Sequence, residues 1–228
     1  MTRMMLPLRA LGVMGAIATL AGSACFSSAA LAQTPILERE GSLRSLQGEH
    51  VYNGTAGQRV AISLTSTEFD GALTLLSPNG TELATNEDYA RSQNPTIIIT
   101  LPSTGAYKIL ARSSYGQAGS YTVNVRPATA YDEAYARGVN LVQSGNFLGA
   151  IDAFREATQA DPNQPVAYLD MADALYTEAT RLRPEEARNI VANYNRAADL
   201  YAQQGNTEMA QMLREQASYL EQSAAGGL

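Results

Sequence analysis

The sequence predicts a two-domain chain in which an all-β antiparallel sandwich precedes an all-α array of helical hairpins. Residues 37–126 contain short runs of β-branched and aromatic side chains, separated by turn-forming residues at intervals of roughly ten residues. Residues 131–224 are instead rich in alanine, leucine, glutamate, arginine and glutamine, all of which favour helices. Residues 127–130 form the expected linker. Hydrophobic residues make up 45% of the 228-residue chain, which is enough for a packed core in each domain.

The β domain is predicted from alternation along its strands. Val60, Ile62 and Leu64 share one face of a run, while small or polar side chains share the other. Successive side chains of a strand point to opposite faces, so this pattern predicts a sheet with one buried face. The same reasoning assigns strands to residues 59–66, 72–77, 96–101, 106–113 and 120–125.

The helical domain is predicted from composition and from the residues at the helix ends. Gly145 and Gly205 each precede an asparagine between two helical runs, which is typical of helix boundaries. Pro165 and Pro184 stand where helices are expected to begin, because the first turn needs no backbone N–H from proline. The expected helices lie near residues 131–144, 147–159, 165–181, 184–204 and 206–222.

The N-terminal segment, residues 1–32, is typical of a secretory signal peptide. Arg3 and Arg9 precede an apolar run, and Ala30-Leu31-Ala32 forms a small-residue cleavage site. We therefore expect an exported protein, periplasmic or extracellular, with no transmembrane segment after cleavage. An uncleaved membrane anchor is the alternative, since the apolar stretch is just long enough to span a bilayer.

Cysteine content and charge exclude several classes of function. Cys25, the only cysteine, lies within the expected signal, so the mature chain would lack disulfides, thiol catalysis and thiolate metal sites. A lipid attached to Cys25 is the minority alternative. The formal net charge is −6, and residues 128–228 carry 14 acidic and seven basic side chains. An acidic surface repels phosphate backbones, so nucleic acid is not an expected partner.

The first predicted hairpin, residues 134–163, has a regular spacing of small and aromatic residues. Gly138 is the small residue expected where two helices cross closely, and Phe154 is the aromatic residue expected to fill the gap. Ala150, Phe154 and Ala157 share one face of the second helix. This spacing resembles a tetratricopeptide repeat. A second unit follows it, and the remaining helices depart from the pattern. A generic helical bundle is the alternative.

The resemblance to tetratricopeptide repeats implies a concave groove lined by the first helix of each hairpin, which would bind a protein or a peptide. Tyrosine combines a large contact area with a polar group, and so favours interfaces. The basic clamp that some relatives use for carboxylate-terminal peptides is absent, because no lysine or arginine occupies an expected groove position. Core packing is the alternative role for each tyrosine. The residues expected to face the groove are Tyr135, Val139, Val142, Leu169, Asp173 and Tyr176.

Several short motifs occur in order within the β domain. Residues 56–60 form an AGQ-x-V strand entry, and Phe69-Asp70 precedes the alternating Leu73-Thr74-Leu75. A Pro78-Asn79-Gly80 turn follows, and then the acidic turn Asn86-Glu87-Asp88. This order resembles the bacterial pre-peptidase C-terminal domain. The resemblance implies a small β-sandwich of the kind appended to secreted proteins. No peptidase domain is recognisable, so an accessory or recognition role is implied, without proteolysis.

Four oxygen-bearing residues are the candidates for a calcium site: Asp70, Asn86, Glu87 and Asp88. Calcium takes six to eight oxygen ligands, and neighbouring loops of a sandwich can supply them. The acidic turn lacks the spacing of an EF-hand loop, and Asp and Asn also favour turns through their own backbone hydrogen bonds. Turn formation is therefore the alternative, and no other metal or cofactor is expected.

Catalysis is not expected from the sequence. His50 is the only histidine, and no G-x-S-x-G motif accompanies it. One histidine without a cysteine also disfavours zinc. We expect a non-enzymatic adaptor that binds a protein or peptide through its helical groove. The alternative is a carbohydrate- or calcium-binding accessory module carried by the sandwich, and a carboxylate-dependent hydrolase is a third hypothesis.

Overall fold

The computed structural model describes residues 35–43, 47–179 and 183–225. The predicted signal segment, with Cys25, lies outside these residues. The strands are β1 (Leu37–Leu43), β2 (Gln47–Gly54), β3 (Arg59–Thr65), β4 (Gly71–Leu76), β5 (Glu82–Asn86), β6 (Thr96–Thr100), β7 (Gly105–Ser113) and β8 (Gly119–Pro127). The helices are α1 (Ala130–Gln143), α2 (Phe147–Ala160), α3 (Pro165–Glu178), α4 (Pro184–Gln203) and α5 (Thr207–Ala225).

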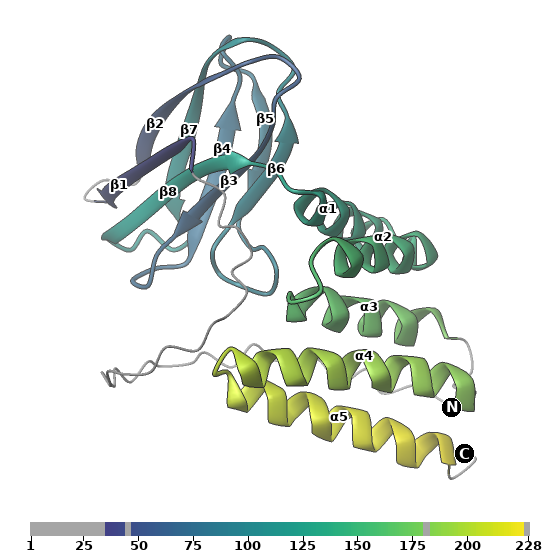
Figure 1. Cartoon of the computed structure of the whole chain (residues 1–228). Helices are drawn as coiled ribbons and strands as arrows, with labels where there is room; N and C mark the ends of the chain where they lie inside the picture. The colour runs from purple at the N-terminus through teal and green to yellow at the C-terminus, as the bar shows by residue number, and fades with distance from the viewer. Residues whose placement is uncertain (1–34, 44–46, 180–182, 226–228) are drawn as a thin grey trace. The chain divides into compact units, whose positions relative to one another are not determined.

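The strands form two four-stranded antiparallel sheets that pack face to face (Figure 1). One sheet has the order β1-β8-β3-β6, and the other has the order β2-β7-β4-β5. Val60, Ile62 and Leu64 of β3 are completely buried between the sheets, as their alternation predicts. Leu73 and Ile109 meet them from the opposite sheet. The predicted fold class, a β-sandwich followed by helices, is confirmed.

Three of the strands, β1, β2 and β5, fall outside the five predicted runs. Each lies at the edge of its sheet, so one side of the strand has no hydrogen-bonded neighbour within the sheet. Their side chains are mostly exposed or half-buried, and β1 carries Glu38, Arg39 and Glu40 in succession. Charged residues at sheet edges are a common protection against unwanted pairing. All four inner strands are among the predicted runs, whereas β6 is the one edge strand that the sequence predicts, from its run of isoleucines.

The sandwich and the helices are joined by a short, fixed junction. β8 ends at Pro127 and α1 begins at Ala130, so only two residues separate them. Thr129 caps α1 by accepting a hydrogen bond from the Asp132 backbone N–H, and the Asp132 side chain accepts one from the Thr129 N–H in return. Arg126 of β8 donates two further hydrogen bonds to the same carboxylate. The predicted linker is thus a hydrogen-bonded corner.

The helices pack against one another in chain order, each against the next (Figure 1). Gly138 of α1 meets the ring of Phe154 of α2, and a Cβ atom at position 138 would lie 2.4 Å from that ring. This is the close crossing that the spacing predicts. Gly145 has a φ of +77° in the turn between α1 and α2, where a side chain would be strained. Assignment to the tetratricopeptide family stays a prediction.

The third helix ends earlier than predicted, at Glu178 rather than near residue 181. Ala179 already has an extended backbone, and Arg183 is extended as well, because Pro184 disfavours a helical conformation in the residue before it. Within the described ranges, none of the helices combines the length and the apolar character needed to cross a membrane.

Candidate functional site

The loop between β5 and β6 contacts the helical array. Tyr89 and Ala90 pack against a helical core cluster that contains Tyr135 and Phe154. The Tyr89 ring meets the Tyr135 ring edge-on, with centroids 5.4 Å apart, and the Tyr131 ring stacks on Tyr135 with centroids 5.6 Å apart. Aromatic pairs in these geometries add stability beyond the area that they bury. Part of the sandwich is therefore bound on the surface of α1 and α3.

Arg91, at the tip of this loop, joins two carboxylates of α3. Its Nε lies 2.6 Å from Asp170 Oδ1, and a terminal guanidinium nitrogen pairs with Asp173 Oδ2. Asp170 and Asp173 are three residues apart, which places both on one face of the helix. Tyr135 and Tyr194 complete the group, which we call the arginine clamp: Arg91, Asp170, Asp173, Tyr135 and Tyr194.

The two tyrosines of the clamp occupy the carboxylate oxygens that the arginine leaves free. The Tyr135 hydroxyl, from α1, donates to Asp170 Oδ2 at 2.5 Å. The Tyr194 hydroxyl, from α4, donates to Asp173 Oδ1 at 2.5 Å. Each carboxylate thus accepts one hydrogen bond from a hydroxyl and one from the guanidinium. The clamp draws on three helices and one sandwich loop, and its two remaining acceptor oxygens are bound by two nitrogens of one guanidinium.

Burial and charge act against each other within the clamp. Burial alone would lower the pKa of Arg91, but Asp170 and Asp173 outweigh it and raise that pKa, so the guanidinium stays charged. Burial raises the pKa of Asp170, although Arg91 and the Tyr135 hydroxyl favour its ionised form. The Asp170 side chain is only 14% exposed. Its negative charge is therefore tolerated because a cation lies beside it.

The loop backbone is strained where it enters the clamp. Ala90 and Arg91 have φ values of 54° and 58°, a region that residues other than glycine rarely adopt. Tyr89 and Ser92 exchange two backbone hydrogen bonds around them, closing a two-residue turn in which glycine and asparagine are the preferred central residues. The Tyr89 hydroxyl is buried without a hydrogen-bond partner. Contact with the helices offsets these costs.

The residues predicted to face the groove have different surroundings in the structure. Tyr135 and Asp173 belong to the clamp, and Val139 is half-buried beside the same core cluster. Leu169 is only 3% exposed and lies in the core shared with α4 and α5. Val142 is exposed, and Tyr176 is half-buried beside the core that contains Leu169. The six residues therefore do not lie together on one open surface.

Sequence reasoning missed three members of the clamp: Arg91, Asp170 and Tyr194. No basic side chain was expected at the groove positions, and the cation that pairs with Asp170 comes from the sandwich, 79 residues earlier in the chain. The Asp170–Asp173 spacing was a usable signal for a cation on this face. No local pattern links it to the loop that carries Arg91.

The residues proposed for calcium are near one another without forming a cluster that could hold a metal. Burial and the charges of Asp88 and Glu87 raise the pKa of Asp70, so these carboxylates interact through space. The Asn86 side-chain oxygen instead accepts a hydrogen bond from the Thr96 N–H. Over the described part of the chain, no three histidine, cysteine or acidic side chains lie close enough to hold a metal ion.

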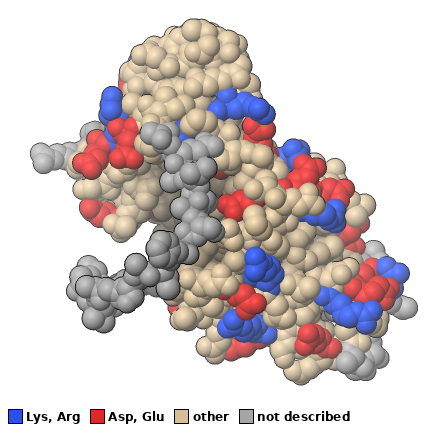
Figure 2. Space-filling view, in the orientation of Figure 1, with Lys and Arg blue, Asp and Glu red and all other residues tan. Residues whose placement is uncertain are grey.

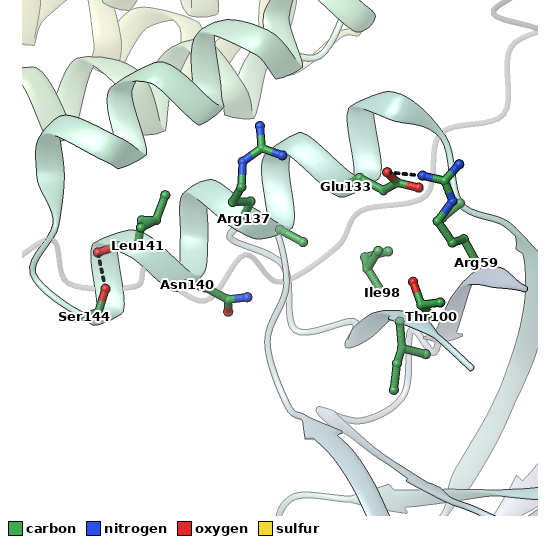
Figure 3. Close-up of a pocket in the computed structure, with 11 residues that line it drawn as sticks. Arg59, Ile98, Thr100, Glu133, Arg137, Asn140, Leu141 and Ser144 are labelled. Carbon is green, nitrogen blue, oxygen red and sulfur yellow. Dashed lines mark hydrogen bonds and ion pairs between the residues drawn. The ribbon is translucent and has the colours of Figure 1, made fainter. Parts of the chain in front are cut away.

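An open crevice of 580 Å³ separates α1 from the edge of the β1-β8-β3-β6 sheet (Figure 3). Arg59 of β3 and Glu133 of α1 form an ion pair of 2.8 Å at one end. Ile98 and Leu141 give the crevice apolar walls. The Ser144 hydroxyl at the other end donates to the Leu141 carbonyl oxygen, so it is not poised as a nucleophile. The crevice thus has an ion pair at one end, apolar walls and a serine hydroxyl bonded to its own helix at the other end.

His50 lies apart from both the clamp and the crevice. Its Nε2 is 2.8 Å from the Tyr121 hydroxyl, and the two rings meet edge-on. Burial, and to a lesser extent the charge of Arg39, lower the pKa of His50. Both effects favour the neutral imidazole, which is half-buried on β2 and packs against an aromatic residue.

Comparison with known proteins supports the assignment of the sandwich. Residues 52–113 match the family model of the bacterial pre-peptidase C-terminal domain. One similar solved structure is the pre-peptidase C-terminal domain of a Bacillus anthracis collagenase, at 14% identity, over 40% of this chain and 88% of that one, with a TM-score of 0.35. Another is PliG of Aeromonas hydrophila, a periplasmic inhibitor of g-type lysozyme, at 14% identity over 40% and 85%, with a TM-score of 0.34. No curated protein matches the chain.

Proposed function

We propose that the protein is an exported, non-enzymatic adaptor that binds a protein or peptide through the face formed by α1, α3 and α4. The observation that supports this most strongly is that the face already holds a polypeptide segment. The β5–β6 loop is bound there by the Arg91 pairs with Asp170 and Asp173 and by the ring contacts of Tyr89. This surface binds a turn of its own chain through the side chains of that turn. The same contacts could bind a similar segment of another protein.

The assignment of a binding role rather than catalysis is part of the proposal. It is supported by the engagement of the sole histidine, His50, with Tyr121 inside the sandwich. The titratable groups of the clamp are paired with one another, so none of them is left as a free general base. Export is proposed from the signal-like segment 1–32, and the sandwich would serve as an accessory docking module.

Site-specific photo-crosslinking tests this function. A photoreactive phenylalanine analogue replaces Tyr176 on α3, at the border of the proposed face. The matched control carries the same analogue at Tyr219 on α5, a tyrosine that is 65% exposed. Irradiation in a native envelope preparation is expected to link a defined partner to position 176 and not to position 219. Equal crosslinking at both positions, or none at position 176, would contradict the proposed function.

A further inference from the structure

We infer that the Asp170–Asp173 pair is an arginine-recognition site, and that the Tyr89–Ser92 turn occupies it in place of an arginine-bearing segment of a partner. This inference rests on the proposed function, and it names the chemistry of the ligand. The turn acts as an intramolecular competitor. A partner segment binds by replacing Arg91 with its own arginine, while the turn withdraws from the helices.

The geometry of the acceptors favours arginine over lysine. Asp170 and Asp173 each offer one oxygen, because the Tyr135 and Tyr194 hydroxyls bind the others. The two free oxygens are bridged by Nε and a terminal nitrogen of a single guanidinium. A planar guanidinium spans two acceptors in a fixed geometry, whereas an ammonium is a single point of charge.

The site is much more stable with a cation than without one, and this favours an exchange of one cation for another. Asp170 is largely buried, and a buried carboxylate without a partner is strongly unfavourable. The turn therefore leaves most readily as another cation enters. Arg91 itself keeps 31% of its side chain exposed, so an incoming segment can reach the pair before the exchange is complete.

The turn is suited to leaving. Its two central residues, Ala90 and Arg91, adopt a left-handed backbone, and the Tyr89 hydroxyl lacks a hydrogen bond. Strain and an unpaired buried group are released when the turn moves away from the helices. These features are typical of a segment whose conformation is imposed by its contacts with the helices and is not the one that its own residues favour.

The clamp is not needed merely to hold the sandwich against the helices, because other contacts already join the two. Arg126 and Asp132 fix the junction between β8 and α1 through two hydrogen bonds. Arg59 and Glu133 join β3 to α1 a short distance away. Withdrawal of the turn leaves both of these pairs in place, so the site can open without separating the domains.

The test uses an arginine analogue supplied from solution. The variant Arg91→Ala empties the site, and N-acetyl-arginine amide is the probe. Binding is measured by calorimetry and by the rise in melting temperature, since a ligand of the folded state must stabilise it. We expect at least tenfold tighter binding to Arg91→Ala than to the wild type. The matched control Arg59→Ala removes another arginine between sandwich and helices, and is expected to bind no better than the wild type.

Two further comparisons identify the acceptors. Adding Asp173→Asn to Arg91→Ala is expected to abolish binding of the probe, and the citrulline analogue, which is uncharged, is expected not to bind. If Arg91→Ala does not fold, Arg91→Lys replaces it, because it keeps a cation beside Asp170 and its ammonium is expected to yield to the planar probe more readily than the wild-type guanidinium does. Equal binding of the probe to wild type and Arg91→Ala, or equal binding of arginine and citrulline analogues, would overturn the inference.

The outcome separates the inference from the proposed function. A partner that crosslinks at Tyr176, together with no binding of the arginine analogue to Arg91→Ala, would leave the adaptor role and refute the arginine site. Binding of the analogue without any crosslinked partner would support the arginine site and contradict the adaptor role. In the case where both hold, Arg91→Ala is also expected to increase the yield of the crosslinked partner.

Discussion

At the residue scale, Asp170 and Asp173 carry most of the chemistry of the clamp. Each carboxylate divides its oxygens between a tyrosine hydroxyl and the Arg91 guanidinium. Asp170 is the more buried of the two and Asp173 the more exposed. The same pair of side chains can thus hold a charge in the interior and still present part of it to solvent.

Replacing Asp170 with asparagine is expected to destabilise the fold. The change removes one charge of a buried ion pair and forces an amide to face both Arg91 and the Tyr135 hydroxyl, at a cost of about 2–4 kcal/mol in the free energy of unfolding. The measurement is a urea titration. Asp152→Asn, which alters an exposed pair with Arg155, is the control and is expected to change stability by less than about 0.5 kcal/mol. Equal losses for both would show that Asp170 has no special role.

Calcium is expected to leave the melting temperature unchanged. The Asn86 side-chain oxygen is occupied by the Thr96 N–H, and Asp70, Glu87 and Asp88 interact without forming a metal-holding group in the described structure. Thermal unfolding with millimolar calcium and with a chelator makes the comparison. A clear rise in melting temperature with calcium would revive the alternative of a calcium-binding sandwich, because a bound ion stabilises the folded state.

At the element scale, the crossing of α1 and α2 depends on the absence of a side chain at Gly138. A Cβ atom there would meet the Phe154 ring at 2.4 Å, well inside contact distance. Gly138→Ala is therefore expected to cost about 1–3 kcal/mol, although alanine is the better helix former. Denaturant titration measures the loss. Phe154→Leu makes room at the crossing. It should therefore lower the free energy of unfolding less in the Gly138→Ala variant than in the wild type.

The junction between β8 and α1 has a predictable pH dependence. Burial alone would raise the pKa of Asp132, but hydrogen bonds from Arg126 and Thr129 outweigh it and lower that pKa below 3.8. The unfolded state therefore binds a proton first as the pH falls, and the stability from Asp132 is lost on the way down through its folded pKa.

The stability difference between wild type and Asp132→Asn is thus expected to be largest near neutral pH and to shrink below pH 3.8. Urea titrations across this range measure it. Glu133→Gln, one residue further along α1, changes a more exposed carboxylate and should show a small difference that varies little with pH. A difference for Asp132→Asn that is constant with pH would contradict this account of the junction.

The elements also show how far the sequence predicts the fold. Inner strands such as β3, with Val60, Ile62 and Leu64, alternate because one face is buried, and their bounds follow from the pattern. Edge strands such as β1 expose most of their side chains and carry no such signal. Helix starts at Pro165 and Pro184 were predictable from local chemistry. The end of α3 was not, because no glycine marks it.

At the scale of the whole molecule, the contacts that join the sandwich to the helices lie beyond any local pattern. Arg91 and Asp170 are 79 residues apart, and Arg59 and Glu133 are 74 apart. Two of the clamp residues, Tyr135 and Asp173, were among the residues predicted to face a groove. Sequence reasoning could not identify the loop bound there, because that depends on the tertiary arrangement. On the face visible in Figure 2, acidic and basic side chains lie next to one another.

The Arg91 contact with α3 and the Arg126 contact at the β8–α1 junction should couple the unfolding of the sandwich to that of the helices. The wild-type protein is expected to show one calorimetric transition. Removing both Arg91 and Arg126 breaks the clamp and the junction together, so the double alanine variant is expected to unfold in two separate transitions, one for each domain. The single variants serve as controls, and each should keep one transition. A single transition in the double variant would show that other contacts couple the domains.

The tether on Arg91 also determines which ligands can compete. A side chain held on a short loop has an effective concentration on the order of millimolar or more at its own site. A lone arginine or a weakly basic peptide at micromolar concentration therefore cannot displace it. A segment that contacts the surrounding tyrosines as well can do so, because its additional contacts add to the exchange. The tethered turn at Ala90 and Arg91 would thus set a selectivity threshold that rejects basic sequences offering charge without shape, while its backbone strain keeps that threshold within reach of a well-matched segment.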